Sequence, residues 1–286
     1  MQTADFLDTL DREGRLLAAA AAEAGTGAEV PTCPDWQVGD LLRHTGMVHR
    51  WAAAFVAQAL TSFRPGEELP GLDGDDLLAW YRESHRGLVD TLAAAPPDVR
   101  CWQVLPAPSP LAGWARRQAH ETTVHRVDAE SARGGAHAEI ARDFAVDGID
   151  ELLRGFHARR KSAVRTEEPR VLRVRATDTG DAVWTVRLSA EPPVTEPGDA
   201  GAADCELGGR PYRCTSRCGT GGRSPRSRGM PRWRSCGGRG PGSSGADARP
   251  RGAGQSASVR VSPSASGTAP PAARAVPRRA GRGPSR

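Results

Sequence analysis

A nine-residue segment, 120–128, contains two histidines and two acids at spacings that could bind a metal ion. At about 100° per residue, Glu121 and His125 lie on one face of a helix with Asp128 beside them. His120 lies about 140° from His125 and cannot share a metal ion with it on a straight helix. The spacing differs from the His-Glu-x-x-His pattern of zinc proteases, because it pairs a carboxylate with an imidazole.

A third ligand must come from another helix, and the predicted helix at residues 38–60 offers His44 and His49. They are five residues apart, so at most one can point into the centre of a bundle, and His44 follows the apolar stripe. Zinc binds imidazole and carboxylate, and three protein ligands leave a position open for water or a thiolate. Asp128 could orient a ligand ring. A plain hydrogen bond between Glu121 and His125 on a solvated face remains the alternative.

Four amphipathic helices are predicted to position these side chains. Apolar residues recur at helical spacing, and Gly- and Pro-rich stretches separate the segments, which span about residues 3–25, 38–60, 74–95 and 110–134. Helices of this length joined by loops favour a four-helix bundle. We expect Trp36, Trp114 and Trp184 to be packing residues. We expect His85, His137 and His157 to be solvated.

A second, α+β domain is predicted after residue 136. Residues 142–161 show helical periodicity, and two later stretches alternate with period two: Leu172, Val174 and Ala176, then Trp184, Val186 and Leu188. Across the turn at residues 178–181 they predict a β-hairpin. A hairpin alone is marginally stable, so further elements should complete the sheet.

Charge divides the chain into an acidic body and a basic tail. Residues 1–205 carry a net charge of −10 and residues 206–286 carry +15, which together give the +5 of the chain. The tail is rich in Arg, Gly and Pro, a composition that cannot bury a core. We therefore predict a mainly α protein with a bundle at residues 1–136, an incomplete α+β domain at 137–207 and a disordered tail at 208–286.

The composition also bears on location. No apolar run approaches the ~18 residues that span a bilayer, and residues 1–10 contain two Asp and no basic residue. Six Cys at irregular spacing do not predict a disulfide framework and favour a reducing compartment. We expect a cytoplasmic protein without membrane association.

Three segments together resemble a known family. Val30–Trp36, Asp40–His44 and Ala119–Glu130 are similar to the mycothiol-dependent maleylpyruvate isomerases of actinobacteria, and the resemblance covers about residues 5–205. It implies that the bundle is DinB-like and that the hairpin opens the family's C-terminal domain.

The resemblance also implies a metal site and a thiol reaction. Carried over by position, the ligands of zinc, or of another divalent metal, are His44, Glu121 and His125, with His49 as the competitor of His44. The metal would hold the mycothiol sulfur as a thiolate, which adds to the cis double bond of maleylpyruvate and is eliminated after rotation to fumarylpyruvate. Alternatives are a mycothiol S-transferase acting on another small electrophile and a zinc-binding module without turnover.

The tail departs from the family, whose second domain continues with more sheet and helix. Residues 210–223 can be encoded by GC-rich codons. Read in a shifted frame, these codons spell a family-like Tyr-Leu-x-Leu-Trp-Asn-Arg-Arg stretch. Codons for residues 228–237 give a second family-like segment in the same frame. We interpret the tail as out of frame after a frameshift between residues 203 and 210. As alternatives, the tail could bind nucleic acid through its arginines, or a metal through its cysteines. We disfavour both, because no Tyr or Phe alternates with Arg and because Cys214, Cys218 and Cys236 lack a second close pair.

Overall fold

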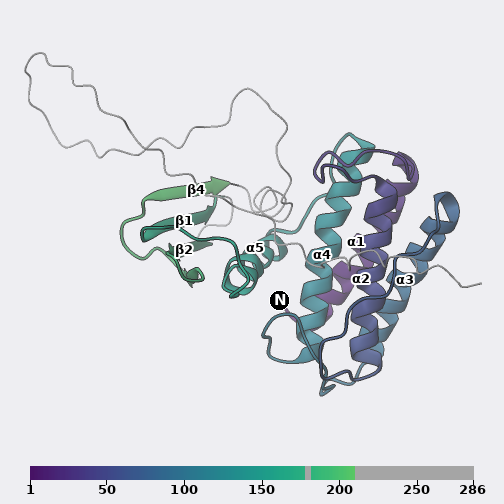
Figure 1. Cartoon of the computed structure of the whole chain (residues 1–286), viewed down its shortest axis with the longest axis horizontal. Coiled ribbons are helices and arrows are strands. Elements are labelled where there is room, and N and C mark those ends of the chain that lie inside the picture. Colours follow the sequence, from purple (N-terminus) through teal and green to yellow (C-terminus); the bar gives the residue numbers. More distant parts are fainter. Residues whose placement is uncertain (178–181, 210–286) are drawn as a thin grey trace, which may run out of the picture.

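The computed structural model describes residues 1–177 and 182–209. The helices are α1 (Thr3–Ala24), α2 (Val38–Ala57), α3 (Gly74–Ala94), α4 (Pro110–Arg133), α5 (Arg142–Asp150) and the π-helix η1 (Glu151–Phe156). The strands are β1 (Arg170–Ala176), β2 (Val183–Leu188), β3 (Val194–Pro197) and β4 (Cys205–Gly209). The predicted order of a four-helix bundle followed by an α+β unit is confirmed (Figure 1). None of the described helices is both long and apolar enough to cross a membrane.

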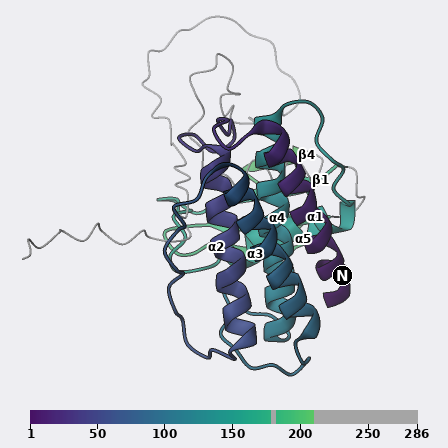
Figure 2. The same cartoon turned by 90° about the vertical axis from the view of Figure 1, so that its right-hand side faces the viewer.

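The four long helices stand side by side (Figure 2), and two clusters of buried apolar side chains lie between them. Helix α1 packs mainly against α4, and α2 mainly against α3. Trp114 is fully buried, and its indole Nε1 donates to the Trp102 carbonyl at 2.9 Å. The packing role predicted for Trp114 is therefore confirmed.

Two helix contacts depend on the absence of a side chain. A Cβ atom at Gly46 of α2 would lie 2.2 Å from the Trp80 ring of α3, and one at Gly14 of α1 would lie 2.2 Å from the His85 ring. His85 is only 5 % exposed, and its Nε2 lies 3.0 Å from the Leu10 carbonyl oxygen. The prediction that His85 is solvated is wrong, because Gly14 leaves room for the imidazole between α1 and α3.

A buried ionic network joins α1 to α4. Arg126 of α4 is fully buried, and its Nε donates to Glu13 of α1 at 2.7 Å. Its Nη1 donates to Glu130 at 2.6 Å and to the Ala138 carbonyl at 3.0 Å. The same side chain therefore fixes both the neighbouring helix and the chain that leaves α4.

Helix α5 lies between the bundle and the sheet (Figure 1). On the bundle side, Arg116 Nε and His120 Nε2 each lie 2.7 Å from Asp147 Oδ2. On the sheet side, Trp184 Nε1 donates to Asp150 at 3.1 Å. The helix predicted over residues 142–161 is shorter than expected: η1 follows Asp150 and ends at Phe156, next to Gly155, a residue that weakens helices.

The sheet has the strand order β3-β2-β1-β4. The predicted hairpin is the antiparallel pair of β1 and β2, with Val174 opposite Trp184. The inward side chains of both strands pack against Ile149 and Leu153, so the assignment of Trp184 to the core is confirmed. Strand β3 pairs antiparallel with β2, and β4 pairs parallel with β1. Strand β4 includes residues 208 and 209, which the predicted boundary assigned to the tail; the turn at 178–181 and residues 210–286 lie outside the described residues.

Candidate metal centre

Three side chains from α2 and α4 meet at one point. His44 Nε2 lies 3.4 Å from Glu121 Oε1, and His125 Nε2 lies 3.2 Å from the same oxygen. One potential ligand atom of each residue lies within 4.8 Å of the other two. Tetrahedral ligands at ~2.0–2.2 Å from zinc are about 3.3–3.6 Å apart, so these donors and spacings fit a divalent cation. The three side chains are 12–20 % exposed, so the cluster is not completely buried.

The other two histidines considered as ligands lie on different faces. His49 is fully buried, and its Nε2 lies 2.9 Å from the Thr122 hydroxyl. Burial holds the pKa of His49 well below its usual value, so the ring is neutral. His120 is directed toward Asp147 of α5. The structure therefore brings His44, and not His49 or His120, to Glu121.

Asp128 orients the ring of His125. Its Oδ2 lies 3.0 Å from His125 Nδ1, and a proton on Nδ1 leaves the lone pair of Nε2 facing the cluster. The Thr32 hydroxyl donates to Asp128 Oδ1 at 2.6 Å, and the Cys33 thiol lies 3.6 Å from Oδ2. Burial and the charge of Asp128 raise the pKa of Cys33 to about 12, so this thiol stays protonated. Sequence reasoning placed Asp128 here but missed Thr32 and Cys33. The signal that could have pointed to them is their place in the turn-rich connector before α2.

The charges of the cluster are coupled. Burial alone would lower the pKa of His125, but hydrogen bonds and charges from Asp128 and Glu121 raise it to about 10. Burial alone would raise the pKa of Glu121, but Arg117 and the two imidazoles hold it well below its usual range. Without a cation the cluster therefore pairs an ionised carboxylate with an imidazolium, and a bound cation would replace that proton.

Arg117 connects the cluster to the second domain. Its Nη2 donates to Glu121 Oε2 at 2.6 Å, and its Nη1 donates to Glu151 of η1. Its guanidinium carbon also lies 4.9 Å from the centre of the Phe156 ring. Sequence reasoning missed this residue, although its i,i+4 spacing to Glu121 is a recognisable signal.

Trp36 forms an apolar wall of the cluster. Its ring centre lies 5.2 Å from that of His44 and 6.4 Å from that of His125, with the latter pair stacked. The side chain also packs against the core between the helices. Trp36 is thus a packing residue, as predicted, and it touches both histidines of the cluster.

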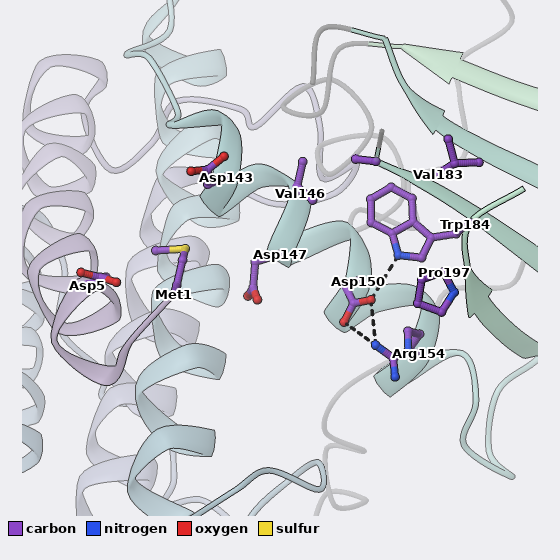
Figure 3. A pocket seen from close by; sticks show the side chains of 12 residues that line it. Met1, Asp5, Asp143, Val146, Asp147, Asp150, Arg154, Val183, Trp184 and Pro197 are labelled. Atoms are coloured by element: carbon purple, nitrogen blue, oxygen red, sulfur yellow. Dashed lines mark hydrogen bonds and ion pairs between the residues drawn. The ribbon is translucent and has the colours of Figure 1, made fainter. Parts of the chain in front are cut away.

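A separate cleft of about 650 Å³ lies between the N-terminus, α5 and the sheet (Figure 3). Asp5, Asp143 and Trp184 are among its lining residues, and none of the candidate metal ligands is. Asp150 in its wall is already bound by Arg154 and by the indole of Trp184. We assign this cleft to the packing between the domains.

The candidate ligands all lie in the helical bundle, which is also the part of the chain that matches a known family. Residues 7–130 match the mycothiol maleylpyruvate isomerase N-terminal domain. The matched segment contains His44, Glu121, His125 and Asp128, whereas α5 and the sheet lie outside it.

One solved structure shares the fold over most of the chain. It is a crystal structure of a histidine-to-alanine mutant of the mycothiol-dependent maleylpyruvate isomerase, with a TM-score of 0.54 and 14 % sequence identity. The alignment covers 77 % of this chain and 89 % of that chain, so it includes the second domain. At this identity the likeness shows a common fold. No curated protein matches the chain significantly.

Proposed function

We propose that the chain is a metal-dependent enzyme that uses mycothiol to isomerise a small cis-unsaturated keto acid of the maleylpyruvate type. The observation that carries the proposal is the convergence of His44, Glu121 and His125 within a segment that matches the family domain. We further propose that residues 1–136 form the metal-binding domain, residues 137–209 a partial second domain, and residues 210–286 an out-of-frame tail.

A divalent cation at this cluster, with zinc as the first candidate, would hold the thiol sulfur as a thiolate near neutral pH. In the proposed reaction the sulfur bonds to one carbon of the cis double bond, and the electron pair moves toward the adjacent carbonyl. The carbon–carbon single bond then rotates, and expulsion of the thiolate restores the double bond in the trans form. The thiol is regenerated, so it acts as a cosubstrate without net consumption.

The residues of the chain have distinct proposed roles in this site. His44, Glu121 and His125 are metal ligands and not acid or base. Asp128 holds the His125 ring with Nε2 toward the metal. Arg117 binds Glu121 Oε2 and thereby leaves Oε1, the oxygen shared by both imidazoles, for the cation.

Metal analysis by mass spectrometry tests the site. Wild-type protein should contain about one zinc or other divalent ion per chain, and His44→Ala, Glu121→Ala and His125→Ala should each lose it. The control is His137→Ala, because His137 is 45 % exposed and lies outside the cluster. A metal-free wild type would contradict the proposal.

Turnover is tested by incubating the metal-loaded protein with maleylpyruvate and mycothiol and following the formation of fumarylpyruvate. Conversion with mycothiol recovered unchanged is the expected result. Stoichiometric consumption of mycothiol would identify an S-transferase instead. Metal binding without any thiol-dependent reaction would leave only the metal-binding module.

A further inference from the structure

In the part of the chain that the structure describes, Arg159 lacks the carboxylate partner that three neighbouring arginines of α4 and η1 have. It is half-buried, and no acidic partner binds it within the described residues. Its Nε is directed at the Phe156 carbonyl, at 3.4 Å. The groups around it are paired with carboxylates: Arg116 with Asp147, Arg117 with Glu151 and Arg154 with Asp150. An anion from outside the chain could therefore pair with this guanidinium.

Phe156 connects Arg159 to the candidate metal centre. The guanidinium carbon of Arg159 lies 4.3 Å from the centre of the Phe156 ring, and that of Arg117 lies 4.9 Å from it. Arg117 in turn binds Glu121 at 2.6 Å. Arg159 is thus linked through two side chains to a proposed metal ligand.

The contacts of Arg159 suit it for binding a carboxylate. Stacking on an aromatic ring holds the plane of a guanidinium, and a planar fork of N–H groups binds carboxylate through two parallel hydrogen bonds. Because Nε is directed at the Phe156 carbonyl, Nη1 and Nη2 remain for such a ligand. Arg154 offers no comparable site, since Asp150 occupies its Nη1.

The local charge also favours an anion. Residues 157–165 contain His157, Arg159, Arg160, Lys161 and Arg165 and no acid, whereas residues 1–205 as a whole carry a net charge of −10. Burial and the nearby charge of Arg117 both lower the pKa of Arg159. A carboxylate at Arg159 would relieve this repulsion.

We propose that Arg159, whose guanidinium shares the Phe156 ring with Arg117, binds a carboxylate of the substrate and so selects for anionic electrophiles. The identity of the anion as substrate rests on the proposed function, whereas the anion site rests on the contacts of Arg159 alone. Nothing in the site requires a metal to be present for the carboxylate to bind.

The test is isothermal titration of the full-length protein with succinate, an unreactive dicarboxylate, at fixed ionic strength and with and without zinc. Arg159→Gln should weaken binding at least about 10-fold, because a charge-assisted pair is lost. The matched control is Arg154→Gln, which should bind succinate within about twofold of wild type. The arginines after residue 205 are common to all variants, so their background binding cancels.

A second variant keeps the charge. Arg159→Lys retains a cation but loses the fork, so succinate binding should weaken several-fold while the fold and the zinc content stay unchanged. Succinate binding by Arg159→Gln equal to that of wild type, or an equal loss in Arg154→Gln, would overturn the proposal. Succinate binding that depends on Arg159 in a protein that binds no metal would uphold the anion site and reject the proposed function.

Discussion

Asp128 Oδ2 lies 3.0 Å from His125 Nδ1, so a carboxylate that is almost completely buried fixes the ring whose other nitrogen faces the candidate metal centre. Asp128 is itself held by the Thr32 hydroxyl, which comes from the connector before α2. A segment distant in the sequence therefore sets the orientation of a ligand on α4.

Replacing Asp128 with Asn should weaken zinc binding about 10- to 100-fold, because the amide no longer offers a charged acceptor to His125 Nδ1. Competition with a chelator of known affinity measures the change. The matched control is Asp143→Asn, an exposed site on α5, which should leave the affinity unchanged. Equal zinc affinities for Asp128→Asn and wild type would show that Asp128 does not orient the ligand.

Replacing Arg117 with Gln should destabilise the protein by about 3–5 kcal/mol, because it leaves the carboxylate of Glu151 buried without its cation. Urea denaturation measures the loss. The double variant Arg117→Gln/Glu151→Gln should recover part of it, since both charges are then absent. Additive losses in the double variant would argue against a direct coupling between these residues.

Replacing Gly46 with Ala should destabilise the protein by about 1–3 kcal/mol, because the new Cβ would overlap the Trp80 ring between α2 and α3. Gly87→Ala on α3 is the control. A Cβ there meets nothing within 4 Å, so the substitution should stabilise the helix by about 0.5–1 kcal/mol. Thermal or urea unfolding measures both changes. A Gly46→Ala variant that is stabilised like Gly87→Ala would contradict the close approach of Gly46 to the Trp80 ring.

Stability of the metal-free protein should fall as the pH drops below about 6.5. Burial lowers the pKa of both His49 and His85, so the unfolded chain takes up protons at a pH where the folded rings stay neutral. Above pH 6.5 both states are neutral at these sites, and the effect vanishes. Each histidine contributes up to about 1.4 kcal/mol per pH unit within this window.

Urea denaturation at pH 7.5 and pH 5.5, with chelator present, measures this dependence. His49→Gln should reduce the difference in unfolding free energy between the two pH values. An unchanged difference in His49→Gln would show that His49 titrates alike in both states.

The helices were predictable because local signals begin and end them. Helices α3 and α4 begin at the predicted Gly74 and Pro110, and Gly134 follows the last turn of α4. Helix α2 ends at Ala57, earlier than expected, because Ala59 adopts a positive φ of 48° that stops the helix. Leu60 then packs against the core from the following loop.

The convergence of the candidate ligands was also predictable, since helical spacing paired Glu121 with His125 and the family resemblance added His44. The pair of Arg117 and Glu151 was not, because it joins two domains and no periodicity relates its members. The burial of His85 was not predictable either, since it depends on the contact with Gly14 across two helices.

The edge strands gave little signal. Strand β3 is short and mostly exposed, so its residues show no alternation of apolar and polar side chains. Strand β4 contains two glycines and is largely exposed as well. Only the hairpin of β1 and β2, with its inward apolar faces, carried the pattern that predicts strands.

Strand β4 covers one edge of β1 with only five residues, from Cys205 opposite Leu172 to Gly209 opposite Ala176. Backbone N–H and C=O groups along an uncovered strand edge can pair with another molecule. A chain shortened before Cys205 would expose this edge of β1 while the bundle kept His44, Glu121 and His125. Such a chain would self-associate through the sheet while its metal site was still intact.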